Sequence, residues 1–304
     1  LQIQLDDASA DWLAYAYPAL AVNILPEPHH LFHVPHYLAA QRRQGVADRL
    51  ALIVLDGMAL ADWLVLWEGW ESRHRWQAET RLLLAQIPTI TAISRQALIS
   101  GRRPADFAST ITHNREEARH WQRFWRDEGL GAHACLYTRD LRAAPPAPDV
   151  QVLCLVVTTI DELHHRALLG AESAQASLRH WRDHQATLLA STLDALLGAG
   201  FAVWLTSDHG ATAAVGIGQP REGLTVETRS LRARTYRDAQ LAQAVQRDFP
   251  ATHLWHDDGL LPADLWALLS LRRTAFAPAD ELHITHGGLS LDEVFVPLVR
   301  FHSA

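Results

Sequence analysis

Three aspartates in this sequence directly follow short apolar segments. Asp56 comes after Ala-Leu-Ile-Val-Leu, Asp161 after Val-Val-Thr-Thr-Ile, and Asp208 after Val-Trp-Leu-Thr-Ser. A single carboxylate at the end of a strand is most often a helix cap or a turn former. Three in the same kind of position favour a shared site, because ligands of open α/β sheets collect beyond the carboxyl ends of the strands.

Three histidines accompany these aspartates. His165 lies four residues after Asp161, so both side chains share one face if a helix begins there. His209 directly follows Asp208, and His286 lies near the end of the chain. Carboxylate oxygens and imidazole nitrogens suit zinc or manganese, whereas three histidine ligands suit magnesium poorly. The residue types therefore predict a pair of divalent metal ions.

A candidate nucleophile lies in the segment 87–104, where Thr89 and Thr91 precede a helical run. A phosphoryl group held by Thr91 would also meet backbone N–H groups at the start of that helix. The alternative is that the hydroxyl groups only cap the helix. The sequence contains no convincing Ser-His-Asp or Cys-His arrangement, so metal-assisted attack by a threonine is the chemistry that we expect.

The elements that must position these side chains are short apolar strands alternating with segments of helical spacing. Strands that are apolar almost throughout indicate a sheet covered on both faces. We therefore expect an α/β sandwich with a mainly parallel central sheet and helices on both faces. The expected strands are 51–55, 132–137, 151–157, 201–206 and 293–299, and the expected helices are 60–77, 116–126, 171–197, 236–248 and 262–273.

Composition limits the classes of partner. The net charge of −7 over 304 residues argues against a protein that wraps duplex nucleic acid over a whole face, although a local basic cleft remains possible. No apolar run is long enough to cross a bilayer, so we expect no membrane contact. Cys135 and Cys154 lie within apolar segments and read as buried thiols, which fits a cytoplasmic location.

Taken together, the ordered motifs resemble the alkaline phosphatase superfamily, and within it the PglZ domain of bacterial phage-defence systems of the BREX and Pgl type. The resemblance covers Leu52 to Phe301 and is specific because the short motifs occur in the family's order. The matching segments are Asp56-Gly-Met58, Pro88 to Leu98 with Ser100-Gly101, Asp161-Glu-Leu-His-His165, Thr206-Ser-Asp-His-Gly210, and His286-Gly-Gly-Leu-Ser290 with Val296-Pro297.

The resemblance implies how the site residues divide between two ions, of which zinc is the expected metal and manganese the alternative. It favours Thr91 as the nucleophile because Gly101 follows ten residues later, and it favours His165 over its neighbour His164 as a ligand. Relatives carry Asn three residues after the nucleophile, where this chain has Ser94 followed by Arg95. The implied assignments are Asp56, Thr91, Asp208 and His209 for one ion, Asp161, His165 and His286 for the other, and Ser94 and Arg95 for substrate binding.

We expect residues 1–45 to form a lead-in packed on a catalytic domain that spans 46–304, with cap-like insertions near 102–150 and 211–280. The chain reads as a fragment of a longer protein. Four histidines in the lead-in have metal-like spacing, but the proline-rich setting favours a packing or solvated role. They are His29, His30, His33 and His36.

The expected function is two-metal hydrolysis of a phosphodiester by a nuclease-like enzyme of phage defence. DNA or another nucleic acid is a possible substrate, and other defence-system proteins are expected partners. The alternatives are a phosphomonoesterase acting on a phosphoprotein or a small metabolite, and a non-catalytic scaffold. Six arginines could line a path for a nucleic-acid strand or form ordinary solvated surface: Arg102, Arg103, Arg229, Arg232, Arg234 and Arg237.

Overall fold

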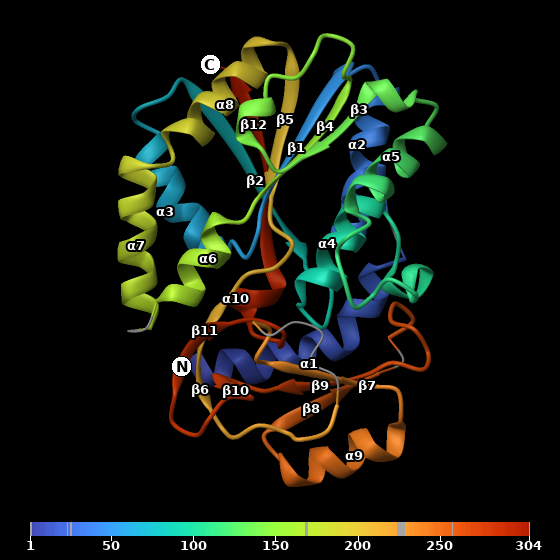
Figure 1. Ribbon diagram of the computed structural model, residues 1–304, viewed down its shortest axis with the longest axis vertical. Coiled ribbons are helices and arrows are strands. Elements are labelled where there is room, and N and C mark those ends of the chain that lie inside the picture. The colour runs from blue at the N-terminus through green and yellow to red at the C-terminus, as the bar shows by residue number, and fades with distance from the viewer. Residues whose placement is uncertain are drawn as a thin grey trace.

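A six-stranded sheet forms the centre of the larger part of the protein in the computed structural model (Figure 1). Its strand order is β2-β12-β5-β1-β4-β3, and β12 runs antiparallel to both of its neighbours. Strands β3, β4, β1 and β5 are parallel, which confirms the predicted α/β class. The strands are β1 (Arg49–Leu55), β2 (Trp76–Leu84), β3 (Cys135–Thr138), β4 (Val152–Val157), β5 (Phe201–Thr206) and β12 (Phe295–Ser303).

The structure describes most of the chain. Positions 224–228 and 257 of the expected insertion 211–280 lie outside the described residues. The described residues are 2–22, 24, 26–167, 170–223, 229–256 and 258–303.

Helices cover both faces of the sheet because successive residues of each strand point to opposite sides. In β1, Ala51, Ile53 and Leu55 pack under one group of helices, whereas Leu52 and its even-numbered neighbours pack under the other. The two groups lie on opposite sides of the sheet in Figure 1. One comprises α3 (Leu60–Trp70), α7 (Ala171–His184) and α8 (Thr187–Gly198), and the other α2 (Val34–Arg43), α4 (Thr91–Ser100) and α5 (Glu117–Asp127).

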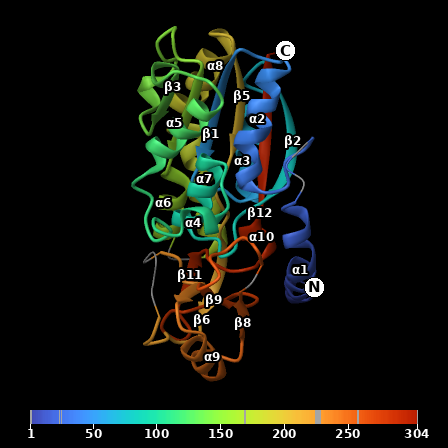
Figure 2. The same ribbon diagram turned by 90° about the vertical axis from the view of Figure 1, so that its right-hand side faces the viewer.

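Two small sheets form a second layer below the central sheet, visible again in the turned view of Figure 2. One has the order β10-β6-β11 and the other β7-β9-β8, with α9 packed on the latter. Their strands fall in the segment 212–285. The elements are β6 (Thr212–Gly216), β7 (Ala233–Tyr236), α9 (Ala239–Asp248), β8 (Thr252–Trp255), β9 (Trp266–Ser270), β10 (Thr274–Ala275) and β11 (Leu282–Thr285).

Short elements complete the fold. A bend separates α7 from α8, and α10 leads directly into β12. The two free cysteines are buried, as predicted. The remaining elements are α1 (Gln2–Leu20), η1 (Leu31–His33), η2 (Pro104–Phe107), η3 (Ala132–Ala134), η4 (Leu141–Ala143), α6 (Thr159–Arg166) and α10 (Leu291–Val294).

Several predicted elements are wrong in type or length. The helix expected over 60–77 ends at Trp70, and β2 follows as an edge strand whose mixed polar pattern resembles a helix surface. The helix expected over 262–273 is instead β9, because a short buried apolar run fits either structure. The helix expected over 171–197 is two helices, and no glycine or proline marks the break.

The boundaries of three other predicted elements need smaller corrections. The strand expected over 132–137 begins as η3 and becomes β3 at Cys135. The strand expected over 293–299 begins as the end of α10, where Ser290 and Glu293 form a capping box. The helix expected over 236–248 begins only at α9, because Asp238 caps it by accepting a hydrogen bond from the Leu241 N–H.

The segment 102–150, which we expected to be a cap-like insertion, packs in part on the central sheet. It supplies β3 to the edge of the central sheet, where β3 pairs with β4, and it supplies α5 to one face. The segment 1–45 is likewise part of the packing, since α2 covers the sheet and α1 contributes Leu13 and Tyr17 to a buried cluster. His30 and His33 are fully buried in this segment, which agrees with a packing role.

Candidate metal and catalytic site

Three adjacent parallel strands deliver the predicted carboxylates to one edge of the sheet. Asp56 follows β1, Asp208 lies two residues after β5, and Asp161 lies in α6, which begins two residues after β4. Because β4, β1 and β5 are neighbours in the sheet, the three aspartates converge although they are far apart in the chain. Each is less than 10% exposed.

The first candidate ion group consists of Asp56, Asp208 and His209, whose ligand atoms lie within 4.8 Å of one another. The Nε2 atom of His209 is 3.8 Å from Asp56 Oδ1 and 3.9 Å from Asp208 Oδ2. On the other side of the ring, Nδ1 donates to the Gly210 carbonyl at 3.0 Å. This hydrogen bond leaves the Nε2 lone pair facing the two carboxylates.

The second candidate group consists of Asp161, His165 and His286, again within 4.8 Å. The helix α6 places His165 Nε2 2.9 Å from Asp161 Oδ1, as the four-residue spacing predicts. His286 follows β11, and its Nδ1 donates to the Thr89 carbonyl at 2.7 Å. The rings of His209 and His286 stack with centroids 3.9 Å apart, so the two groups adjoin.

Both groups fit a divalent cation. Asp56 Oδ1 is buried and makes no hydrogen bond to any residue that the structure describes. His165 Nε2 is also buried and lies 2.9 Å from Asp161 Oδ1 without good hydrogen-bond geometry. A buried acceptor without a donor is costly unless a cation satisfies it. Burial and the neighbouring Asp56 carboxylate raise the pKa of Asp208, and burial together with His286 lowers the pKa of His209. A bound cation would favour the ionised aspartates and the neutral imidazole that metal ligation requires.

The two candidate threonines have different surroundings. Thr91 is the first residue of α4, and its Oγ1 lies 2.9 Å from His209 Nε2 beside the first ion group. Thr89 is fully buried, where its Oγ1 accepts from the Gly287 N–H at 2.9 Å and donates to the Gly288 carbonyl. Only Thr91 lines the pocket above the ion groups.

The start of α4 differs from the sequence expectation. Its N-cap residue is Ile90, whose side chain makes no capping hydrogen bond, so neither Thr89 nor Thr91 is the N-cap residue. The N–H groups of Ile93 and Ser94 donate to the Ile90 carbonyl at 3.0 and 2.8 Å. These two N–H groups already donate within the helix, so they are not the free donors to a phosphoryl group that we expected at this helix start.

Ser94 and Arg95 have protein partners in place of the substrate contacts expected for them. Ser94 is fully buried, and its hydroxyl group bonds the Gln86 backbone at 3.0 Å. The Arg95 guanidinium donates to Asp56 Oδ2 at 2.6 Å and, through Nε, to Glu117 Oε1 at 2.7 Å. Arg95 is 1% exposed but belongs to the lining of the pocket described next, so its contact with substrate stays a prediction.

A pocket of 610 Å³ opens above the two ion groups. Besides the predicted residues it is lined by polar side chains that the sequence analysis did not assign to the site. Asn114 and Arg139 lie outside every family motif, so only the tertiary structure reveals them. The lining residues are Asp56, Thr91, Arg95, Asn114, Arg139, Thr158, Asp161, Glu162, Arg229 and His286.

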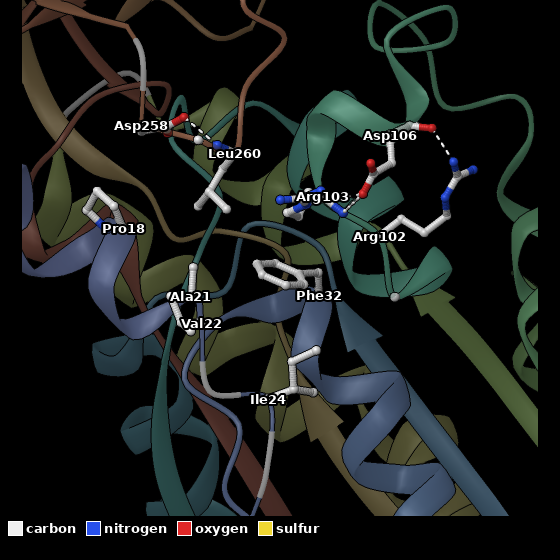
Figure 3. A pocket seen from close by; sticks show the side chains of 12 residues that line it. Pro18, Ala21, Val22, Ile24, Phe32, Arg102, Arg103, Asp106, Asp258 and Leu260 are labelled. Carbon is white, nitrogen blue, oxygen red and sulfur yellow. Dashed lines mark hydrogen bonds and ion pairs between the residues drawn. The ribbon is translucent and has the colours of Figure 1, made fainter.

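Of the six arginines considered for a strand-binding path, only Arg229 lines this pocket. Arg232 is fully buried and pairs with Glu293 at 3.0 Å, and Arg234 lies over the Phe276 ring. Arg102 and Arg103 line a different pocket of 510 Å³, where both bond Asp106 (Figure 3). The strand-binding path over these six arginines stays a prediction, of which only Arg229 belongs to this pocket.

His164 does not belong to either ion group. It is buried, with Nε2 3.3 Å from Asp62 Oδ2, and Asp62 in turn accepts from the Ala59 N–H at the start of α3. Burial opposes protonation of His164, but the Asp62 carboxylate outweighs it and raises the pKa of the imidazole. Its geometry agrees with the preference for His165 as the ligand.

Residues 36–301 match the family model of the BREX system PglZ alkaline phosphatase-like domain. Among solved structures, murine ectonucleotide pyrophosphatase/phosphodiesterase 5 is similar over 83% of this chain and 87% of its own, with a TM-score of 0.57 and 13% identity. An inactive variant of that murine protein, with threonine replaced by alanine and in complex with AMP, gives the same values.

The human form of the same protein covers 84% of this chain and 87% of its own, with a TM-score of 0.55 and 11% identity. Similarity at this low identity establishes the fold. No match to a curated protein sequence was found. None of the described helices is both long and apolar enough to span a membrane.

Proposed function

Because the chain belongs to the family of BREX-system PglZ alkaline phosphatase-like domains, we propose that it is a two-metal phosphodiesterase with Thr91 as its nucleophile. The family and the fold support hydrolysis of a phosphoric ester. The observation that carries the finer proposal is the position of Thr91, whose hydroxyl group lies beside the first ion group on the wall of the 610 Å³ pocket.

Asp56, Thr91, Asp208 and His209 would hold one ion, and Asp161, His165 and His286 the other. Zinc is the proposed metal, with manganese as the alternative, because three imidazole ligands suit these ions better than magnesium. When bound, the ions would lower the pKa of the Thr91 hydroxyl group and stabilise the charge that develops on the substrate oxygens.

In the proposed reaction, Thr91 Oγ1 forms a bond to phosphorus while the ester P–O bond on the opposite side breaks. The hydroxyl proton passes to solvent, and the leaving alkoxide takes a proton from water. Water then attacks the phosphothreonine, which restores the Thr91 hydroxyl group and releases a phosphomonoester. Thr91 is well placed because the first turn of α4 holds it against His209.

Arg95 supports the preference for a diester. A phosphomonoester carries up to one more negative charge on its transferred group than a diester, so an enzyme for monoesters benefits from an extra cation at that group. Arg95, four residues after Thr91, is a residue that could supply this cation, but Asp56, Asp208 and Glu117 already surround its guanidinium. We therefore assign Arg95 to positioning the carboxylates of the first ion group.

The structural relatives add support of a similar kind. The printed description of the murine neighbour identifies it as a pyrophosphatase and phosphodiesterase that loses activity when a threonine becomes alanine. AMP bound to that variant is a nucleotide phosphoester. We propose that this chain acts on nucleic acid, including DNA, in the cytoplasm alongside other proteins of a phage-defence system.

The deciding experiment is the ratio of kcat/KM values for bis(4-nitrophenyl) phosphate and 4-nitrophenyl phosphate, measured with zinc, manganese and magnesium. We expect a ratio well above one with zinc or manganese and no turnover after chelation. A ratio well below one, with plasmid DNA left intact, would favour a phosphomonoesterase. Absence of bound metal and of turnover would favour a scaffold.

A further inference from the structure

Two arginines on the wall of the catalytic pocket are anchored by buried carboxylates yet remain half-exposed. Arg139 donates through Nη2 to Glu117 Oε2 at 2.8 Å and through Nε to the Tyr137 hydroxyl group at 3.0 Å. Arg229 donates through Nη1 to Asp161 Oδ2 at 2.9 Å. Their side chains are 47% and 55% exposed, whereas those of Glu117 and Asp161 are only 2% and 10% exposed.

Both guanidinium groups keep donors for a further partner. A guanidinium has five N–H groups in a planar fork that matches phosphate oxygens. Within the described part of the chain, Arg139 Nη1 and Arg229 Nε and Nη2 make no hydrogen bond. An arginine fixed at one edge loses less side-chain entropy when its other edge binds an anion, which favours binding.

The two arginines are attached to different ion groups. Glu117, which anchors Arg139, also holds Arg95, and Arg95 holds Asp56 of the first group. Asp161, which anchors Arg229, is itself a member of the second group. Each arginine is therefore linked to one of the two ion groups, and both line the pocket in which the scissile phosphate would lie.

The remaining carboxylate of the pocket wall does not cancel this charge. Glu162 accepts a hydrogen bond from Thr158 at 3.1 Å, and Arg166 lies 3.8 Å from its other oxygen. The pocket is also an open one of 610 Å³, which leaves room for more than a single phosphate group.

We propose that Arg139 and Arg229 bind the phosphates on either side of the scissile one in a single nucleic-acid strand. This inference rests on the proposed phosphodiesterase function and adds the residues that favour a strand over a small diester. Contacts to phosphates position a strand without reading its sequence, so the preference concerns length and charge.

The kinetic test compares a substrate with flanking phosphates and one without. For Arg139→Gln and Arg229→Gln we expect KM for a short single-stranded oligonucleotide to rise about tenfold, as for loss of a charge-assisted hydrogen bond. In each variant, the ratio of kcat/KM for the oligonucleotide to kcat/KM for bis(4-nitrophenyl) phosphate should therefore fall about tenfold, whatever the change in the basal reaction. Arg229→Lys, which keeps the charge, should recover part of the loss. Equal effects on both substrates, or none, would overturn the proposal.

Binding provides a readout that does not require turnover. We measure the affinity of the zinc-loaded Thr91→Ala protein for a labelled oligonucleotide by fluorescence anisotropy at several salt concentrations. For each arginine replaced in this background, the slope of log affinity against log salt concentration should become shallower by about 0.7. Arg166→Gln is the matched control, since Arg166 is cationic and near Asp161 in α6 but contacts Glu162 instead. An identical change in Arg166→Gln would show that the net charge of the protein alone causes the change in salt dependence, and would contradict the proposal.

Comparison substrates separate the possible outcomes. Turnover of a nucleoside triphosphate that depends on both arginines, with no dependence for the oligonucleotide, would point to a small polyphosphate and overturn the strand assignment. Arginine-dependent strand binding without hydrolysis of any diester would sustain this inference while the proposed activity fails. Diester hydrolysis that does not depend on the two arginines would support the proposed phosphodiesterase activity and overturn the strand-binding inference.

Discussion

Hydrogen-bond partners distinguish two threonines that the sequence places only two residues apart. The Thr89 hydroxyl group ties the segment before α4 to Gly287 and Gly288, and the Thr89 carbonyl orients His286. The Thr91 hydroxyl group faces His209 and the pocket. Thr89 therefore positions the metal-ligand candidate His286, whereas Thr91 has the exposure to the pocket that a nucleophile requires.

Replacing Thr91 should therefore separate chemistry from architecture. In Thr91→Ala we expect kcat for bis(4-nitrophenyl) phosphate to fall at least about a thousandfold, because the hydroxyl group beside the first ion group is lost. Zinc content, measured by elemental analysis, should remain near that of wild type because the imidazole and carboxylate ligands persist.

Thr89→Ser is the control, since it keeps the hydroxyl group that bonds Gly287. Its kcat should remain within about tenfold of wild type. An active Thr91→Ala protein beside an inactive Thr89→Ser protein would exchange the roles of the two residues.

The helix α4 links the nucleophile to the packing of the sandwich. It begins at Thr91 and ends at Gly101, which caps it in the left-handed conformation with φ of 65°. The ten-residue spacing between these positions is thus the length of one helix. A Cβ at position 101 would lie 2.9 Å from the Phe124 ring, so this turn requires glycine both for its backbone and for its space.

Gly101→Ala should destabilise the protein more than a left-handed glycine replaced in open space. We expect a loss of about 2–4 kcal/mol in the free energy of unfolding, from backbone strain together with overpacking against Phe124. Gly129 is the matched control: its φ is 89°, but a Cβ there meets nothing within 4 Å. Gly129→Ala should cost only about 1–2 kcal/mol. Equal losses in chemical denaturation would show that the Phe124 contact relaxes freely.

Two neutral histidines at η1 bond the backbone of α1 and of the residue that follows it. His30 Nε2 donates to the Tyr17 carbonyl at 2.9 Å, and His33 Nε2 to the Ala21 carbonyl at 3.1 Å. His33 Nδ1 accepts from the His29 N–H at 3.1 Å, which is possible only for the neutral ring. Burial lowers the pKa of His30 to about 3 and that of His33 to about 4.

Acid should therefore weaken the whole fold over a defined range. An unfolded histidine has a pKa of about 6.5, so the unfolded state binds these protons first as the pH falls. The stability is fully present above about pH 6.5 and declines toward pH 4 and 3, where the folded rings also become protonated. In urea titrations, His33→Asn should be less stable at pH 7 but show a pH slope smaller by about one proton between pH 6 and 5. An unchanged slope would mean that His33 is protonated in the folded protein.

The sequence alone determined the α/β class, the strands that carry the aspartates, and the set of six metal-ligand candidates. These predictions depend on local information. Parallel strands expose their carboxyl ends at one edge, so the residues that follow them must meet, and the Asp161–His165 spacing needs only one helical turn. The edge strand β2 and the two small sheets were not predicted because their patterns of apolar and polar residues occur in both helices and strands.

Only the tertiary structure decided which partners the polar side chains near the site have. Arg95 meets Asp56, Asp208 and Glu117, while Ser94, its neighbour in the chain, turns to the Gln86 backbone. Arg139 and Arg229 reach the pocket from segments that no motif connects. Such contacts join residues many positions apart, and their energies depend on burial and on the geometry of the facing groups, which residue type and spacing do not specify.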